Sequence, residues 1–288
     1  MWQRYQLILR VLAPIHIGWN KIGNVQRTRP YVTGRALWGA LTARLTRDQH
    51  NTPSAETYKD TGKWVHKHLA LPYLYPAVLH SGSYRLLLPW DDATPSRILS
   101  SYSGTALDPA SYAADEGLLH EVEYIAPHTC DTGEPVYLVG YLFLDKESQA
   151  KESALCHALQ QLQVGGERGY GWGRLRLVDL SLCASCTSWD LFGVDYAPDV
   201  SHARPRLTVA KGCPLLAHTI ATGTHAQGEL EPLVGREWAV AGDGQQLAFS
   251  RVCYMPGATP TQPTTYKIGN YGVWKPITCS QCTCQPPD

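Results

Sequence analysis

Five glycines within nine residues constrain this chain more than any other local feature. They are Gly165, Gly166, Gly169, Gly171 and Gly173, between an apolar helical stripe over 147–163 and a strand pattern over 174–182. A tight helix-to-strand turn needs one or two glycines. Five favour a loop whose backbone amides approach a phosphate or a neighbouring chain closely. Arg168, Tyr170 and Arg174 add charge and a stacking surface.

The remaining patterns of the first 182 residues alternate between strand and helix. Strands are predicted over 5–12, 119–125 and 135–144, and a helix over 35–47 that Thr33 caps. The tripeptide at 131–133 suits a hairpin between the last two strands. Residues 18–34 are predicted as a loop, and 51–117 as short strands with long excursions. This order indicates an α+β, ferredoxin-like (RRM-like) antiparallel sheet with two helices on one face and the other face open.

Beyond residue 182 the pattern changes to short strand candidates separated by Pro, Gly and Thr, with no convincing helix. The candidates cover 206–210, 238–241, 247–254 and 266–274. We therefore expect two domains: a ferredoxin-like domain over 1–182 and a β-rich C-terminal lobe over 183–288. No apolar stretch approaches the length needed to span a bilayer, and the N-terminal segment lacks a signal-peptide core, so no membrane partner and a cytoplasmic location are expected.

Charge is distributed unevenly although the totals cancel, with 25 basic and 25 acidic residues. The first 47 residues hold eight basic side chains and no acidic one, which leaves 17 basic and 25 acidic residues in the remainder. Such a segment attracts a polyanion, whereas the usual alternative is a solvated basic loop. Aromatic residues that suit base stacking are interleaved with the charges. The predicted RNA-binding residues of this segment are Trp19, Lys21, Arg27, Arg29, Tyr31 and Arg35.

Two motifs resemble those of one superfamily. The loop GGERGYGWGRL and the N-terminal segment APIHIGWNKIGNVQRTRPYVTGRALWGALTARL are similar to the glycine-rich loop and the first strand-to-helix segment of CRISPR-associated RAMP proteins. The resemblance implies a ferredoxin-like fold and a subunit of a type III effector complex in antiviral defence. It implies CRISPR guide RNA (crRNA), target RNA and other subunits as partners, with sequence read by base pairing.

Catalysis is the main alternative. Some RAMP proteins process the guide precursor with a histidine, so His16 at the end of the first strand is the candidate catalytic residue if the chain is a metal-independent endoribonuclease. A hydrogen-bonded structural histidine is the commoner outcome. Segment 19–34 contains no Asp or Glu, unlike the target-cutting members. We therefore predict no cleavage of target RNA, unless Asp48, Asp60, Asp91 or Asp92 approaches through the fold. A third interpretation is a scaffold without RNA contact.

Two Cys-x-x-Cys pairs have metal-ligand spacing. They are Cys183 with Cys186, and Cys279 with Cys282. Together they suit a structural zinc that ties the C-terminal tail to the first domain, although 92 residues separate the pairs along the sequence. The alternative is four surface thiols. No other cofactor is required by any motif of the chain.

Overall fold

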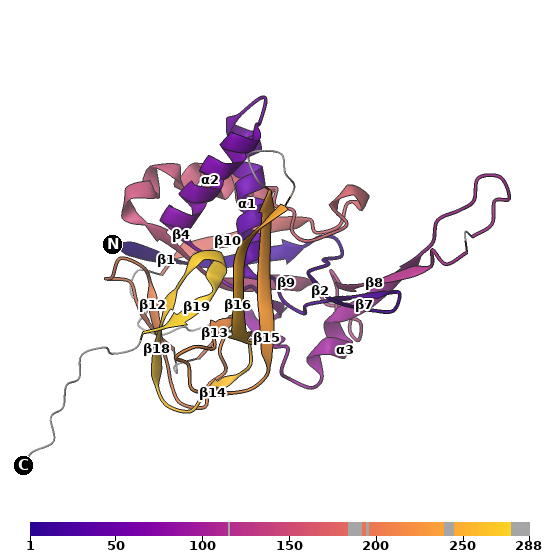
Figure 1. The fold of residues 1–288 in the computed structure, drawn as a ribbon. Helices are drawn as coiled ribbons and strands as arrows, with labels where there is room; N and C mark the ends of the chain where they lie inside the picture. The colour runs from indigo at the N-terminus through magenta and orange to yellow at the C-terminus, as the bar shows by residue number, and fades with distance from the viewer. Residues whose placement is uncertain (115, 184–191, 194–195, 239–244, 278–288) are drawn as a thin grey trace, which may run out of the picture. The chain divides into compact units, whose positions relative to one another are not determined.

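The computed structural model describes residues 1–114, 116–183, 192–193, 196–238 and 245–277. The chain forms two compact units, which are 1–185 with 270–272, and 186–269 with 273–288. The domain boundary expected after residue 182 lies three residues before the end of the first range. Figure 1 shows the elements of both units, which are described separately below.

The first unit is built on an antiparallel sheet of order β10-β1-β9-β5-β6, with a short β4 beside β9. The strands are β1 (Trp2–Val11), β4 (Leu69–Ala70), β5 (Tyr75–His80), β6 (Ser83–Leu86), β9 (Val136–Asp145) and β10 (Leu175–Leu182). Helix α1 follows β1, and helix α4 connects β9 to β10. The last strand, β10, therefore lies beside the first, β1. Strand β9 lies between β1 and β5. This is the ferredoxin-like order, so the predicted α+β fold class is confirmed.

The core lies between one sheet face and the helices. Leu7 and Leu9 of β1 are fully buried in one cluster with Leu37 and Leu41 of α1 and Leu159 of α4. Burying each such leucine contributes about 1.5–3 kcal/mol. The alternating apolar residues of β1 thus face the core, as the sequence predicted.

The opposite sheet face is largely buried, contrary to the expectation of an open face, since Arg4 and Tyr141 on it are 4% and 1% exposed. The guanidinium of Arg4 lies 4.8 Å from the centre of the Tyr141 ring, and that of Arg10 lies 5.2 Å from the Tyr137 ring. These cation–π pairs place arginine and tyrosine side chains together on that face.

The helices differ in part from those predicted. Helix α1 (Gly34–Gln49) begins after Thr33, whose hydroxyl accepts the Ala36 amide as expected. Helix α4 (Glu152–Gln160) is shorter than the predicted 147–163, since 146–151 is a 3₁₀ turn. Helix α2 (Ala55–His68) was not predicted, although Ser54 and Thr57 form a capping box. Its buried positions include Thr61 and Gly62, so an apolar period is hard to recognise.

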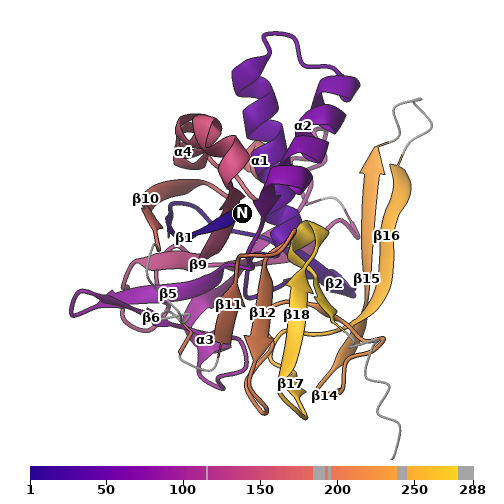
Figure 2. The ribbon, with the colours of Figure 1, turned by 90° about the vertical axis from the view of Figure 1, so that its left-hand side faces the viewer.

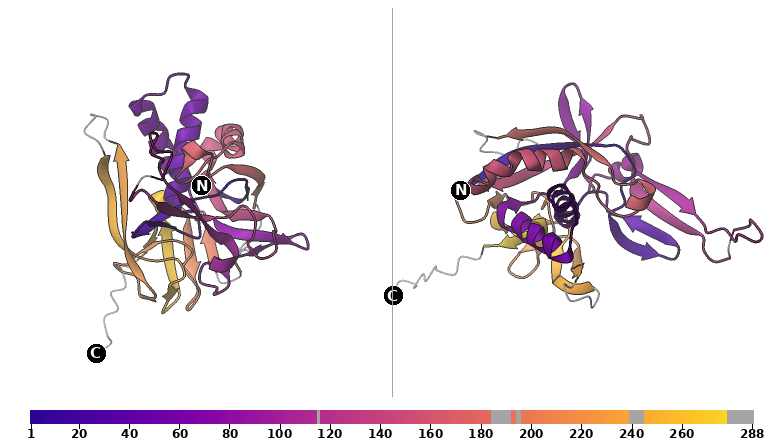
Figure 3. Two further views of the ribbon diagram at one scale, coloured as in Figure 1. Left: turned by 90° about the vertical axis from the view of Figure 1, so that its right-hand side faces the viewer. Right: turned by 90° about the horizontal axis from the view of Figure 1, so that it is seen from above.

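A second, four-stranded sheet of order β2-β3-β8-β7 corrects two predictions. Its strands are β2 (Gly18–Ile22), β3 (Val25–Thr28), β7 (Leu99–Gly104) and β8 (His120–Ile125), and the short helix α3 (Thr94–Ile98) precedes β7. Residues 18–28 are a hairpin rather than a loop. Strand β8 pairs with β3 and β7 instead of forming a hairpin with β9, although residues 129–134 do form the predicted turn. The β7–β8 hairpin extends away from the central sheet of its unit (Figure 3).

The second unit is β-rich, as predicted, and its main sheet has the order β11-β12-β18-β19-β13-β16-β15 (Figure 2). Its strands are β11 (Tyr196–Asp199), β12 (Arg206–Val209), β13 (Thr219–Ile220), β15 (Leu230–Trp238), β16 (Gln245–Tyr254), β18 (Thr264–Ile268) and β19 (Trp274–Pro276), with β14 (Ala226–Gln227) paired to β17 (Thr259–Pro260). Tyr266 and Trp274 stack in its core at 5.7 Å. Within the described ranges, no helix is long and apolar enough to cross a membrane.

Candidate functional site

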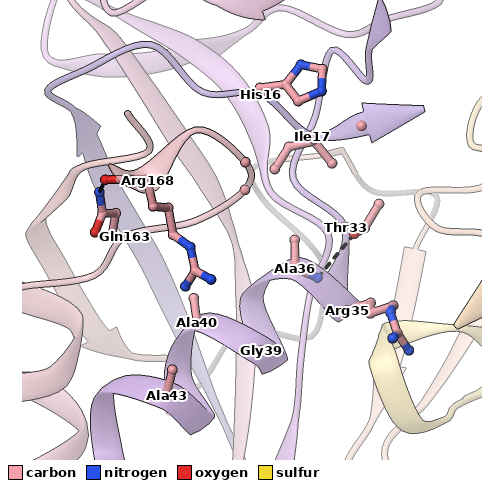
Figure 4. A pocket seen from close by; sticks show the side chains of 13 residues that line it. His16, Ile17, Thr33, Arg35, Ala36, Gly39, Ala40, Ala43, Gln163 and Arg168 are labelled. Atoms are coloured by element: carbon pink, nitrogen blue, oxygen red, sulfur yellow. Dashed lines mark hydrogen bonds between the residues drawn. The ribbon is translucent and has the colours of Figure 1, made fainter. Parts of the chain in front are cut away.

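A pocket of about 380 Å³ lies where three segments of the first unit meet. Its walls are residues 16–18 after β1, the N-terminal half of α1, and the glycine-rich loop from Gln163 to Arg168. Figure 4 shows these segments together. The two motifs that stood far apart in the sequence therefore line one cavity.

Main-chain hydrogen bonds hold the glycine-rich loop against the segment after β1. The Gly166 amide donates to the His16 carbonyl at 2.9 Å, and the Gly173 amide donates to the Pro14 carbonyl at 2.7 Å. The Gln163 carboxamide closes the loop from inside, because its nitrogen donates to the carbonyls of Arg168 (3.0 Å) and Trp172 (2.7 Å). The loop is thus built as a fixed wall of the pocket.

Backbone geometry explains three of the five glycines. Gly165, Gly171 and Gly173 have φ values of +81°, +85° and +79°. A Cβ at Gly165 would overlap the His16 carbonyl oxygen, and one at Gly173 would overlap the Val164 carbonyl oxygen. Gly169 has open space around it and an ordinary φ. The number of glycines is therefore mainly a folding requirement, and the case for a functional loop has to come from the side chains in the pocket.

Helix α1 forms one wall of this pocket. Its first turn lies in that wall, where the helix dipole and the amide groups favour an anion. The residues of α1 that line the pocket beyond Arg35 are small, which leaves room beside the helix backbone; they are Ala36, Gly39, Ala40 and Ala43. Their spacing of i, i+3, i+4 and i+7 places them on one helix face, so this part of the site could be recognised from the sequence.

Two arginines line the pocket, and no Asp or Glu is among its lining residues. Arg168 extends from the glycine-rich loop toward Ala40 (Figure 4). Its guanidinium makes no hydrogen bond or ion pair with any residue that the structure describes. The Arg35 guanidinium lies 5.1 Å from the centre of the Tyr271 ring. Arg168 is therefore the cation best placed to receive a ligand.

His16 is a pocket residue with a structural hydrogen bond. Its Nδ1 lies 2.7 Å from the Glu123 carbonyl oxygen, and the residue is 7% exposed. Because a carbonyl only accepts, Nδ1 carries the hydrogen and Nε2 is the acceptor of the neutral ring. The ring packs beside Gly166 rather than facing an open sheet.

The basic segment 19–31 divides into exposed and internal residues. Trp19 is 44% exposed and Lys21 is exposed, and both lie on β2, which starts at the pocket. Arg27 pairs with Glu123 at 3.0 Å. The same carboxylate accepts the Thr28 amide at 2.9 Å. Glu123 was not predicted as the partner of Arg27, since it lies 96 residues away in the sequence and no local pattern marks it.

Arg29 and Tyr31, which were predicted to bind RNA from a loop, are both buried. The Arg29 Nη1 donates to the Tyr31 hydroxyl at 3.2 Å, and both residues are buried. The Tyr31 ring lies 5.8 Å from that of Tyr73 and 5.7 Å from that of Tyr75. With its ring covered by other tyrosines, Tyr31 is not available to stack on a base.

The other predicted residues lie away from this pocket. Tyr170 is 85% exposed on the short 3₁₀ turn Arg168–Tyr170. Arg174 is exposed and lies beside Leu12 in a separate depression. Of the cysteine pairs, only Cys183 falls within the described residues, where its thiol lies 3.8 Å from the Ser181 carbonyl oxygen. Cys186, Cys279 and Cys282 lie outside them, so the zinc site stays a prediction.

Fold and pocket together define a ferredoxin-like α+β domain, with a glycine-rich loop fastened to the end of its first strand, followed by a β-rich unit. No protein-family model and no curated protein matches the chain.

Among solved structures, the chain is similar to protein chains in cryo-EM structures of the Type III-B Cmr-beta complex. With cognate target RNA and AMPPnP bound, the TM-score is 0.48 at 10% identity, covering 88% of this chain and 85% of the other. With cognate target RNA alone, the TM-score is 0.47 at 12% identity, covering 88% of this chain and 86% of the other. For the apo state, the TM-score is 0.41 at 12% identity, covering 64% of this chain and 98% of the other.

Proposed function

We propose that this chain binds single-stranded guide RNA, and acts as a non-catalytic, cytoplasmic subunit of a type III CRISPR effector complex. The observation that carries the proposal is the pocket beside α1, in which Arg168 has no protein partner among the described residues and no carboxylate lines the wall. The two motifs that resemble RAMP sequences both contribute to this pocket.

The chemistry of the pocket suits an RNA phosphate. An arginine fork offers parallel N–H donors to phosphate oxygens, and a helix N-terminus adds a favourable partial charge. The small side chains of α1 let a sugar–phosphate backbone approach closely. Trp19 and Lys21 extend the surface along β2 with an exposed ring and a further cation. These contacts recognise backbone and shape, so that sequence is read by base pairing within the complex, with target RNA and other subunits as partners.

The geometry favours binding over the alternative of guide processing. A general base must reach the proton that it removes, whereas His16 is largely buried and held through Nδ1 on the Glu123 carbonyl. We assign His16 a positioning role at the junction of the two motifs.

The test is the salt dependence of RNA binding by the full chain. Arg168→Ala should weaken binding to single-stranded RNA of any sequence and lower the slope of log K against log salt by about 0.7 for each lost phosphate contact. Arg35→Ala should add a second such loss, and Arg35→Lys should retain part of it. Lys63→Ala is the matched control, because it removes an exposed cation that pairs with Asp60 on α2.

The opposite outcomes are clear. An unchanged slope and affinity in the folded Arg168→Ala protein would contradict the phosphate assignment. A wild-type chain that binds no RNA would favour the scaffold interpretation.

A further inference from the structure

A second pocket, of about 500 Å³, is lined by a different part of the glycine-rich loop. Its walls come from β7, β8 and the turn at 167–172, and include Tyr102, His120, Glu167, Tyr170 and Trp172. All of them belong to the first unit. A pocket of this size with aromatic walls and a few polar groups has the composition of a small-ligand site.

The aromatic wall is preorganised on one side and open on the other. The Trp172 ring meets Tyr124 edge-on at 5.1 Å and Tyr102 at 6.3 Å, so two tyrosines fix its orientation. Tyr170, by contrast, is almost fully exposed. A planar ring is the ligand shape that such a wall accommodates.

Glu167 is the charged group of this pocket. It is half-buried, and its carboxylate makes no hydrogen bond or ion pair within the described part of the chain. Its φ is +52°, a left-handed conformation that costs a non-glycine residue free energy. The other left-handed positions of this loop are glycines. A non-glycine residue in this conformation beside a pocket marks a candidate functional position.

Two of the polar groups that line the pocket, the Glu167 carboxylate and a ring nitrogen of His120, are acceptors. The His120 Nδ1 lies 3.2 Å from the Leu118 carbonyl, so it carries the hydrogen, and Nε2 is the acceptor of the neutral ring. Gly104 lies opposite His120 across the β7–β8 ladder, and a Cβ there would lie only 3.1 Å from Nε2. A flat ligand that carries hydrogen-bond donors would satisfy these two acceptors.

Among nucleobases, guanine meets this requirement best. Its Watson–Crick edge places N1–H and the N2 amino group side by side, which matches both oxygens of one carboxylate. Adenine and cytosine present one amino group next to an acceptor nitrogen, and uracil presents one N–H between two carbonyls. A carboxylate therefore gains two charge-assisted hydrogen bonds from guanine and at most one from the others.

We propose that this pocket binds an unpaired guanine, stacked against Trp172 and Tyr170, with the Glu167 carboxylate accepting from N1–H and N2–H. The inference rests on the proposed RNA-binding function, and it adds a base preference to it. Consecutive residues of one loop face the two pockets: Glu167 the guanine pocket and Arg168 the phosphate pocket. One nucleotide segment that crosses the loop is thus contacted on both sides.

The experiment uses the full chain with four nucleoside monophosphates, followed by oligouridine RNAs that carry one G, A or C. GMP should bind at least about fivefold more tightly than AMP, CMP or UMP, the factor expected for one good bidentate contact. Glu167→Gln should remove this preference and leave the salt slope of RNA binding unchanged. Glu167→Gly should also remove it without lowering the melting temperature, since glycine relieves the strained φ. Glu121→Gln is the control carboxylate on β8.

Failure of the two proposals is distinguishable. Equal binding of all four nucleotides, or a guanine preference that survives in Glu167→Gln, would overturn the guanine pocket while the Arg168 salt slope is unaffected. Selective GMP binding by a chain that does not bind RNA would overturn the proposed function alone. Glu167-dependent binding of N-acetyl-arginine amide without GMP binding would assign the pocket to an arginine of a protein partner and overturn the proposal.

Discussion

The Gly166 amide donates a hydrogen bond of 2.9 Å to the carbonyl oxygen of His16, and this bond joins the glycine-rich loop to the end of the first strand. The bond is formed between main-chain atoms, so it depends on how closely the two backbones approach and not on the histidine ring. Gly165, which precedes Gly166, allows that approach because a side chain there would overlap the same carbonyl oxygen.

Gly165→Ala should therefore lower the free energy of unfolding by more than about 2 kcal/mol, since it combines a backbone overlap with a strained φ. Gly169→Ala is the matched control in the same loop, and it should change stability by less than about 0.5 kcal/mol because no atom lies near its added Cβ. Urea denaturation of both variants measures the difference. Equal stabilities would show that the loop relaxes freely and is not a fixed wall.

Tyr31 should matter for stability and not for RNA binding. Tyr31→Phe keeps the ring stack with Tyr73 and loses the hydrogen bond from Arg29, at a cost of about 1–3 kcal/mol. RNA affinity, measured by fluorescence anisotropy, should stay at the wild-type value. Trp19→Ala, which removes an exposed ring, should lower that affinity. A loss of RNA binding in folded Tyr31→Phe would return this hydroxyl to the interface.

The ion pair between Arg44 and Asp48 on α1 should make stability depend on acidity. The hydrogen bond from Arg44 lowers the pKa of Asp48 below its ordinary value of 3.8. A lowered pKa in the folded state means that the pair stabilises the protein above that value and stops doing so as pH falls through the lowered pKa.

A double-mutant cycle with Arg44→Ala and Asp48→Asn should give a coupling free energy of about 0.3–1 kcal/mol at pH 7. This coupling should disappear once the pH has fallen through the lowered pKa of Asp48. The cycle also separates this pair from the charge of His157, which acts on the same carboxylate. A coupling that grows on acidification would contradict the assignment.

This chain should not cut target RNA. Asp48 is paired with Arg44 and Asp60 with Lys63, and neither these nor Asp91 and Asp92 line the pocket beside α1. Replacing each of the four by Ala in the assembled complex should leave every cut site of the target RNA in place, as mapped by sequencing gels. Loss of a single cut with intact assembly would make this subunit catalytic.

Local sequence patterns were sufficient where neighbouring residues determine the structure. The cap at Thr33, the alternation of β1 and the order of β1, α1, β9, α4 and β10 could be predicted, because capping and amphipathic period act within a few residues. Strand pairing is different. Residues 18–28 form a hairpin that β8 extends, and β8 was assigned to the wrong partner because its alternation does not identify the strand beside it.

The composition of the site follows the same division. The sequence by itself determined that the first 47 residues carry only basic charges and that a glycine-rich loop follows the last helix of the first unit. Only the tertiary structure decided which of those residues reach a surface: Arg29 is internal, Arg27 is paired with Glu123, and Arg168 lines a cavity with α1. The physical reason is that burial and ion pairing are set by residues far apart in the chain, which no local period records.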